Sequence, residues 1–153
     1  MFQLDFSGDS IEKALAKEGE IISTVSGISM RPMLTQHRDM IVVEAIKRPL
    51  VKGDVPLYRL ESGKLVLHRI LKVRDNDYII RGDNTYFLEY VPKEYVLGVL
   101  KGFYRVGKYY DCNKSRAYHA YIVYNRITYI PRKFWVKTLR PILSRVKRKI
   151  IKH

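Results

Sequence analysis

The chain has 153 residues, enough for one domain with a substantial core and too few for two domains of ordinary size. Its formal net charge of +14 is unevenly distributed: residues 1–112 carry 17 Lys and Arg against 15 acidic residues, whereas residues 113–153 carry twelve Lys and Arg and no acid. We therefore predict a nearly neutral β-rich domain over 1–112 and a basic, tyrosine-rich tail over 113–153. The single cysteine, Cys112, excludes an internal disulfide and is expected to be a small buried apolar side chain.

The N-terminal segment does not have the pattern of a secretory signal peptide, because residues 1–8 are mixed and residues 9–17 are charged throughout. No apolar stretch approaches the roughly 20 residues that a membrane-spanning helix requires. These features predict a cytoplasmic protein, with peripheral contact at the inner face of the membrane left open. Neither a cofactor nor a metal ion is expected.

The first predicted element is a short amphipathic helix over residues 9–17. Asp9 is placed to cap its start, and Gly19 is placed to end it. Ile11 and Leu15 fall on one face of this helix and form a small apolar stripe.

From there to about residue 104 the pattern consists of short β-rich runs separated by turn residues. Residues 61–64 and 74–77 are predicted to be hairpin turns. Short strands with tight turns and no interleaved helices indicate a mainly β domain, an antiparallel β sandwich or partly closed barrel. The predicted strands are 20–25, 40–46, 55–60, 65–73, 78–81 and 96–104.

The basic tail is interrupted by Pro131 and Pro141, and its end has the pattern of an amphipathic helix with Phe134 and Trp135 just upstream. Three interpretations remain open for it. The tail over residues 131–153 binds an anionic membrane surface, or its apolar stripe packs on the β domain, or it binds nucleic acid. The last is the least favoured, because no recognised nucleic-acid module is present. The apolar positions of the stripe are Leu139, Ile142, Leu143, Val146 and Ile150.

Ser29 is the candidate nucleophile. A serine hydroxyl reacts at neutral pH only when a base lies within hydrogen-bonding reach and a donor stabilises the oxyanion that forms. Gly27 permits an unusual turn or close approach of a substrate, and Pro32 fixes the chain just after the serine. The backbone N–H of Ser29 is itself a candidate oxyanion donor.

His68 is the candidate general base. Strand alternation places it on one face with Val66 and Ile70, and imidazole titrates near neutrality. The other histidines have no matching partners. Asp83, in a Gly-Asp-Asn sequence, is the candidate acid that would hold the imidazole tautomer. Each of these residues also has a purely structural interpretation: a turn, a core histidine and a second turn.

Taken together and in this order, these segments resemble the successive motifs of the type I signal peptidase superfamily. The most specific element is the Ser-Met-x-Pro of residues 29–32, followed by the later His-Arg and Gly-Asp-Asn. The resemblance covers roughly residues 20–104. The matching segments are 26–34, 52–55, 67–70, 81–84, 91–92 and 96–99.

The resemblance implies a serine endopeptidase that cuts leader or signal-like peptides after small side chains. Ser29 takes the place of the nucleophile, and His68 takes the place of the base found in the archaeal and endoplasmic-reticulum members, where bacterial members have lysine. Asp83 takes the place of the acid. Gly27 and Met30, together with Pro32, are then expected to contact the substrate.

This chain also departs from the superfamily pattern. Typical members have a transmembrane helix before the serine, whereas this chain has only the short helix over residues 9–17. It therefore looks most like the small anchorless bacterial members. Glu89 stands where a second acid often follows, and its role is left open, as is whether it or Asp83 orients His68. Alternatives are a non-catalytic peptide-binding module of the same fold, an accessory protein docked by its tail and, last, a self-cleaving relative.

Overall fold

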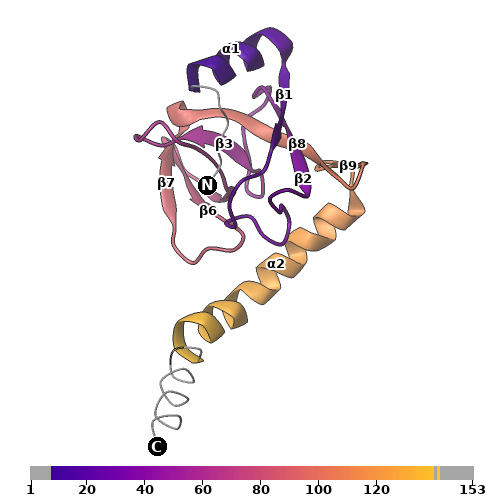
Figure 1. Cartoon of the computed structure of the whole chain (residues 1–153). Helices are drawn as coiled ribbons and strands as arrows, with labels where there is room; N and C mark the ends of the chain where they lie inside the picture. The colour runs from indigo at the N-terminus through magenta and orange to yellow at the C-terminus, as the bar shows by residue number, and fades with distance from the viewer. Residues whose placement is uncertain (1–7, 140, 142–153) are drawn as a thin grey trace, which may run out of the picture. The chain divides into compact units, whose positions relative to one another are not determined.

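The computed structural model describes residues 8–139 and 141. The chain divides into two compact units, Met1–His119 and Ala120–His153. The change of composition in the sequence had placed this division after residue 112. The first unit contains all the strands that the structure describes (Figure 1). The candidate site lies within this unit.

The predicted N-terminal helix is confirmed as α1 (Gly8–Glu18). Ile11 and Leu15 are both buried, so the apolar stripe packs against the domain. The helix ends at Gly19, which has a φ of 77° and donates its N–H to the carbonyl of Leu15 at 2.9 Å. The predicted capping side chain of Asp9 lies outside the described side chains.

The strands form two antiparallel sheets, as the mainly β, antiparallel prediction required, and the larger sheet curls into a half-barrel. Figure 1 shows β1, β2 and β8 side by side in the larger sheet. That sheet has the order β1 (Glu20–Thr24), β2 (Asp39–Glu44), β8 (Val96–Arg105), β3 (Pro56–Arg59), β4 (Leu65–Leu67), with β9 (Lys108–Asp111) also paired to β8. The smaller sheet has the order β5 (Arg69–Val73), β6 (Asp77–Arg81), β7 (Glu89–Pro92).

Both predicted hairpins are present, with β3 paired to β4 and β5 paired to β6. Two strands, β7 and β9, were not predicted. The prediction of one strand over residues 65–73 is wrong at its centre, because the strand is interrupted at His68. Its first half belongs to the larger sheet and its second half to the smaller one, so His68 lies at the junction of the two sheets.

One cluster of buried side chains holds the two sheets together. Tyr58 and Val99 come from the larger sheet, and Ile70, Ile80 and Val91 come from the smaller sheet. Tyr58 and Ile80 are fully buried, so the contact between the sheets excludes water. The junction that carries His68 is therefore part of the buried core.

Cys112 is buried, as predicted, and burial raises the pKa of its thiol to about 12. A thiol with so high a pKa is protonated at neutral pH. It therefore has the structural role that the sequence indicated, not that of a reactive thiolate.

The last described elements are α2 (Arg116–Phe134) and a π-helical segment (Trp135–Leu139). The helix continues through Pro131, which the sequence had indicated as an interruption. The predicted amphipathic stripe from Ile142 to Ile150 lies outside the described residues. No helix within residues 8–139 combines the length and the apolar character needed to cross a bilayer.

Candidate active site

Ser29 lies in the loop that connects β1 to β2, residues 25–38, which we call the serine loop. Gly27, with a φ of 89°, opens this loop in a conformation that favours glycine. The N–H of Arg31 then donates to the carbonyl of Ile28 at 3.2 Å, which closes a tight turn around the serine. The peptide bond between Arg31 and Pro32 is cis. The turn leaves Ser29 partly exposed.

The Gly-Asp-Asn segment, residues 82–84, is hydrogen-bonded to this turn. The backbone N–H of Asn84 donates to the carbonyl of Ser29 at 2.7 Å, and its side-chain amide donates to the carbonyl of Ile28 at 3.2 Å. A Cβ added to Gly82 would lie 2.8 Å from the carbonyl oxygen of Ser29 and 3.0 Å from Nε2 of His68. Only glycine fits at position 82. Nε2 of His68 and the backbone oxygen of Ser29 therefore both lie close to Gly82.

The other nitrogen of His68, Nδ1, faces two partners, the partly exposed Glu89 and the buried Tyr58. It lies 3.0 Å from Oε1 of Glu89 and 3.1 Å from the hydroxyl of Tyr58. The hydroxyl of Tyr58 donates to Oε2 of Glu89. An ionised carboxylate only accepts hydrogen bonds, so Nδ1 is the nitrogen that donates to Glu89. In a neutral imidazole the unprotonated nitrogen is then Nε2, on the side of Ser29.

Glu89 and Tyr58 are held in these protonation states by their surroundings. Burial alone would raise the pKa of Glu89, but the hydrogen bonds from His68 and Tyr58 outweigh it and hold the pKa below its usual value. Burial and then the neighbouring Glu89 raise the pKa of Tyr58. At neutral pH Glu89 is therefore a carboxylate and Tyr58 a hydrogen-bond donor.

The structure does not place Asp83 in the role predicted for it, that of orienting His68. Its carboxylate binds the Arg69 guanidinium in a bidentate pair, with Nε to Oδ1 at 2.9 Å and Nη2 to Oδ2 at 2.7 Å. Both side chains are buried. Successive residues of an extended segment point to opposite sides, so Arg69 and its partner lie away from the face of His68.

Arg69 uses its remaining donors to join separate parts of the first unit. Its Nη1 donates to the carbonyl of Gly53 at 2.9 Å and to the hydroxyl of Tyr118 at 3.0 Å. Its Nη2 contacts the sulfur of Met33, in the serine loop, at 2.9 Å. The Arg69–Asp83 pair is therefore a structural centre beneath the candidate site.

Glu89 is the acidic residue whose role the sequence left open, and strand register explains its position. Ile70 pairs with Ile80 across β5 and β6, and Ile80 pairs with Glu89 across β6 and β7. Paired residues share a face of a sheet, and so do residues two apart on a strand. His68 is two residues before Ile70, so the carboxylate of Glu89 lies on the same face as the imidazole of His68.

A groove of about 670 Å³ runs over these residues. Ser29, His68 and Glu89 all contribute to its lining, and so do Gly27 and Met30, two of the three predicted substrate contacts. The third, Pro32, lies outside the lining, and its carbonyl accepts a hydrogen bond from Arg38 at 3.3 Å. Most of the other lining side chains are aliphatic or aromatic, among them Val25, Leu65, Leu67, Phe87, Tyr90 and Val91.

The groove contains a hydroxyl, an imidazole and a carboxylate, the groups that acyl transfer uses, but the hydroxyl of Ser29 is not hydrogen-bonded to His68. Within residues 8–139, neither Oγ nor the backbone N–H of Ser29 has a hydrogen-bond partner, His68 included. Catalytic hydrogen bonds are often long in a free enzyme and shorten when the substrate binds. The N–H of Ser29 is available to an oxyanion, whereas that of Gly27 donates to Oε1 of Gln36 at 3.2 Å.

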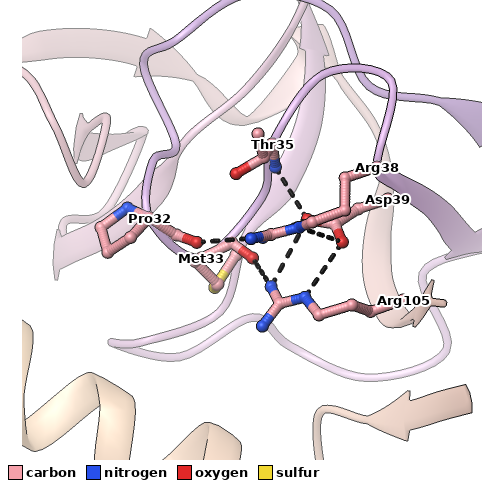
Figure 2. A network of polar contacts seen from close by, with 6 residues as sticks. All are labelled: Pro32, Met33, Thr35, Arg38, Asp39 and Arg105. Atoms are coloured by element: carbon pink, nitrogen blue, oxygen red, sulfur yellow. Dashed lines mark hydrogen bonds and ion pairs between the residues drawn. The ribbon is translucent and has the colours of Figure 1, made fainter.

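A second buried carboxylate, which the sequence analysis missed, closes the other end of the serine loop (Figure 2). Asp39 accepts the backbone N–H of Thr35 at 2.8 Å, Nε of Arg38 at 2.9 Å and Nε of Arg105 at 3.0 Å. Arg105 also donates to the carbonyl of Met33. Arg105 lies far along the chain on β8, so no local pattern reveals the cluster.

The charge of Asp39 is stabilised where it lies. Burial would raise the pKa of its carboxyl, but the hydrogen bonds from Arg38, Arg105 and the Thr35 N–H lower it below the usual value.

In the described part of the chain, no three His, Cys, Asp or Glu side chains gather so as to hold a metal ion.

Comparisons with known proteins add no relative: no family model matches the chain, and no curated protein matches its sequence. The link to signal peptidases therefore consists of the motif resemblance alone.

Proposed function

We propose that the first unit is a serine endopeptidase in which Ser29 is the nucleophile, His68 the general base and Glu89 the acid that orients the base. The observation that carries the proposal is the position of the imidazole of His68. The partly exposed carboxylate of Glu89 lies 3.0 Å from Nδ1, and Nε2 lies beside Gly82 next to the backbone of Ser29. A carboxylate at one ring nitrogen, with the other nitrogen toward a serine, is the part of a serine hydrolase site that orients the general base, and this supports the proposal.

In this mechanism, Nε2 of His68 takes the proton of the Ser29 hydroxyl as Oγ attacks the carbonyl carbon of a peptide bond. The carbonyl oxygen becomes an oxyanion that accepts the N–H of Ser29. Glu89 stabilises the imidazolium that forms and keeps the ring oriented. His68 then gives its proton to the leaving amine, and water, deprotonated by the same base, hydrolyses the acyl-enzyme to release the second product.

The groove supports an extended and partly apolar peptide as the substrate. Its walls are mostly aliphatic, and Ile28, Phe87 and Tyr90 are exposed along it. Together with the motif resemblance, this favours a peptidase of the type I signal peptidase kind that cuts leader or signal-like peptides. Cleavage after small side chains is what the resemblance implies.

The test is incubation of the purified chain with a library of peptides, read by mass spectrometry. Cleavage should occur with the unmodified chain and with Ser62→Ala, a serine in the exposed β3–β4 hairpin turn, but not with Ser29→Ala. Cleavage by Ser29→Ala would remove Ser29 from the mechanism. Trapping of a peptide in the groove without cleavage by any form would favour the second candidate, a peptide-binding module, which the missing Ser29–His68 hydrogen bond among the described residues supports.

A further inference from the structure

The second unit carries an apolar face that points to solvent along α2. Val123, Ile127, Ile130 and Phe134 are 57%, 69%, 74% and 56% exposed. Their spacing of four, three and four residues places all four side chains on one side of an α-helix. Ala120, at the start of the same stripe, is also exposed. A continuous row of large exposed apolar side chains is uncommon on a protein that meets only water, and it marks an interaction surface.

The groups around this face identify the partner. Arg126 and Lys133 are exposed and lie beside the face, each one position before an apolar member of it. Trp135, also exposed, follows Phe134 directly. No Asp or Glu occurs after Asp111 in the whole chain. An apolar face with basic flanks and aromatic residues at one end matches the boundary between the headgroups and acyl chains of an anionic bilayer.

Two other occupants fit less well. A second copy of the unit would bring cation against cation, since the unit has no acid to offer its partner. Nucleic acid would be held by the basic side chains but would leave Ile127 and Ile130 without a role. A surface that is both anionic and apolar beneath its charges uses the apolar face and the basic side chains beside it together.

We propose that α2 docks on the surface of an anionic lipid bilayer through the face formed by Val123, Ile127, Ile130 and Phe134, with Arg126 and Lys133 contacting the headgroups. The face begins well before the 131–153 segment to which the sequence analysis limited membrane contact. The proposal rests on the second unit alone and holds whether or not the first unit is a peptidase.

The only tryptophan of the chain, Trp135, reports on this docking directly. The full chain is titrated with vesicles of phosphatidylcholine alone, or of equal parts phosphatidylcholine and phosphatidylglycerol, at low and at high salt. The anionic vesicles should shift the emission of Trp135 to shorter wavelength and protect it from acrylamide, and added salt should weaken the effect. Neutral vesicles should give little change.

Two variants separate the apolar face from its charges. Ile127→Gln/Ile130→Gln keeps helix-forming residues and should weaken partition into anionic vesicles at least tenfold. Arg126→Gln/Lys133→Gln should weaken it about fivefold for each charge removed at low salt. The matched control is Val106→Asn, which removes an 87% exposed apolar side chain from the first unit, at a φ of 48° that asparagine tolerates, and should bind as the unmodified chain does.

Equal partition of the Ile127→Gln/Ile130→Gln variant and the unmodified chain would overturn the proposal, as would equal binding to neutral and anionic vesicles. Sedimentation equilibrium supplies the remaining test. A dimer that this variant converts to monomer, without vesicle binding by either form, would assign the face to a second copy instead. Cleavage of a water-soluble peptide should be unchanged in both variants, so failure here and failure of the peptidase proposal are distinguishable.

Discussion

Glu89 Oε1 lies 3.0 Å from Nδ1 of His68, and this contact joins the last strand of the smaller sheet to the interruption between β4 and β5. The same carboxylate accepts the hydroxyl of Tyr58 from the larger sheet. The ring is therefore fixed by groups from both sheets. Its second nitrogen is left toward the serine loop, and this geometry gives the following predictions.

Replacement of Glu89 by glutamine should lower kcat/KM about 10²- to 10⁴-fold with little loss of stability, because the amide neither selects the Nδ1–H tautomer nor stabilises the imidazolium. The measurement is peptide cleavage under single-turnover conditions, with urea unfolding as the check on the fold. Asp83→Asn separates the two candidate acids: its effect on kcat/KM, corrected for the fraction folded, should be much smaller. The reverse order of the two effects would return Asp83 to the role that the sequence indicated.

Loss of Asp83 should instead reduce stability. Asp83→Ala leaves the buried Arg69 without its bidentate partner, and breaking such a pair typically costs about 3–5 kcal/mol in the free energy of unfolding. Urea unfolding followed by circular dichroism measures this cost. Asp75→Ala, in the exposed β5–β6 turn, is the matched control and should fall within about 0.5 kcal/mol of the unmodified chain. A loss below 1 kcal/mol on removal of Asp83 would contradict the structural role assigned here.

Tyr58→Phe should act on catalysis through Glu89. The variant keeps the buried ring but removes one of the two side-chain donors to the carboxylate, a charge-assisted hydrogen bond whose loss we expect to lower kcat about tenfold. KM should change little, because the hydroxyl faces the core and not the groove. Tyr95→Phe, at a 40% exposed tyrosine, serves as the control. An effect on KM alone would show that Tyr58 contacts substrate.

Gly82→Ala should abolish cleavage. The new methyl group would meet the backbone oxygen of Ser29 at 2.8 Å and Nε2 of His68 at 3.0 Å, so the serine turn and the ring must separate. Overpacking of this kind costs about 1–3 kcal/mol of stability in addition to the lost activity. Gly63→Asn, in a turn with a φ of 79° and open space, should keep full activity. Normal cleavage by Gly82→Ala would show that the two groups do not act together.

Acid should destabilise the serine loop through Asp39. The native pKa of this carboxyl lies below its usual value of about 3.9, so the folded state favours the charged form. Its stabilising contribution is therefore present above that value and is lost as the pH falls through the lower native pKa. Urea midpoints measured between pH 7 and pH 2 should fall less steeply for Asp39→Asn than for the unmodified chain, and equal slopes would contradict the assignment.

The sequence predicted the parts of the fold that depend on local signals. The first helix and both hairpin turns carry their own capping and turn residues, and their strands alternate. β7 was missed because four residues ending in Pro92 give no alternation to recognise. The interruption at His68 was missed because residues 65–73 read as one continuous apolar run, and only the pairing partners show that the chain changes sheet there.

The residues of the candidate site also fall into those that the local sequence predicts and those whose position depends on strand pairing. Ser29 and His68 were predicted from residue type, order and motif, and the structure places them beside Gly82. The sequence could not decide between Asp83 and Glu89 as the partner of His68, because the position of Glu89 depends on the register of β6 and β7, which aligns Ile80 with Glu89. The Asp39 cluster could not be predicted either, since its second arginine comes from β8 through pairing of Asp39 with Arg105.

The junction of the two sheets at His68 makes the position of the imidazole sensitive to small movements between the sheets. The residues before and after His68 belong to different sheets. A small movement of one sheet relative to the other therefore displaces Nε2 of His68 from the serine loop before the strands unfold. Heating or mild denaturant should then abolish the proposed peptide cleavage while the far-ultraviolet circular dichroism spectrum is still native. Substitutions at the buried Val99 or Ile80, which never touch a peptide, should inactivate it by the same route.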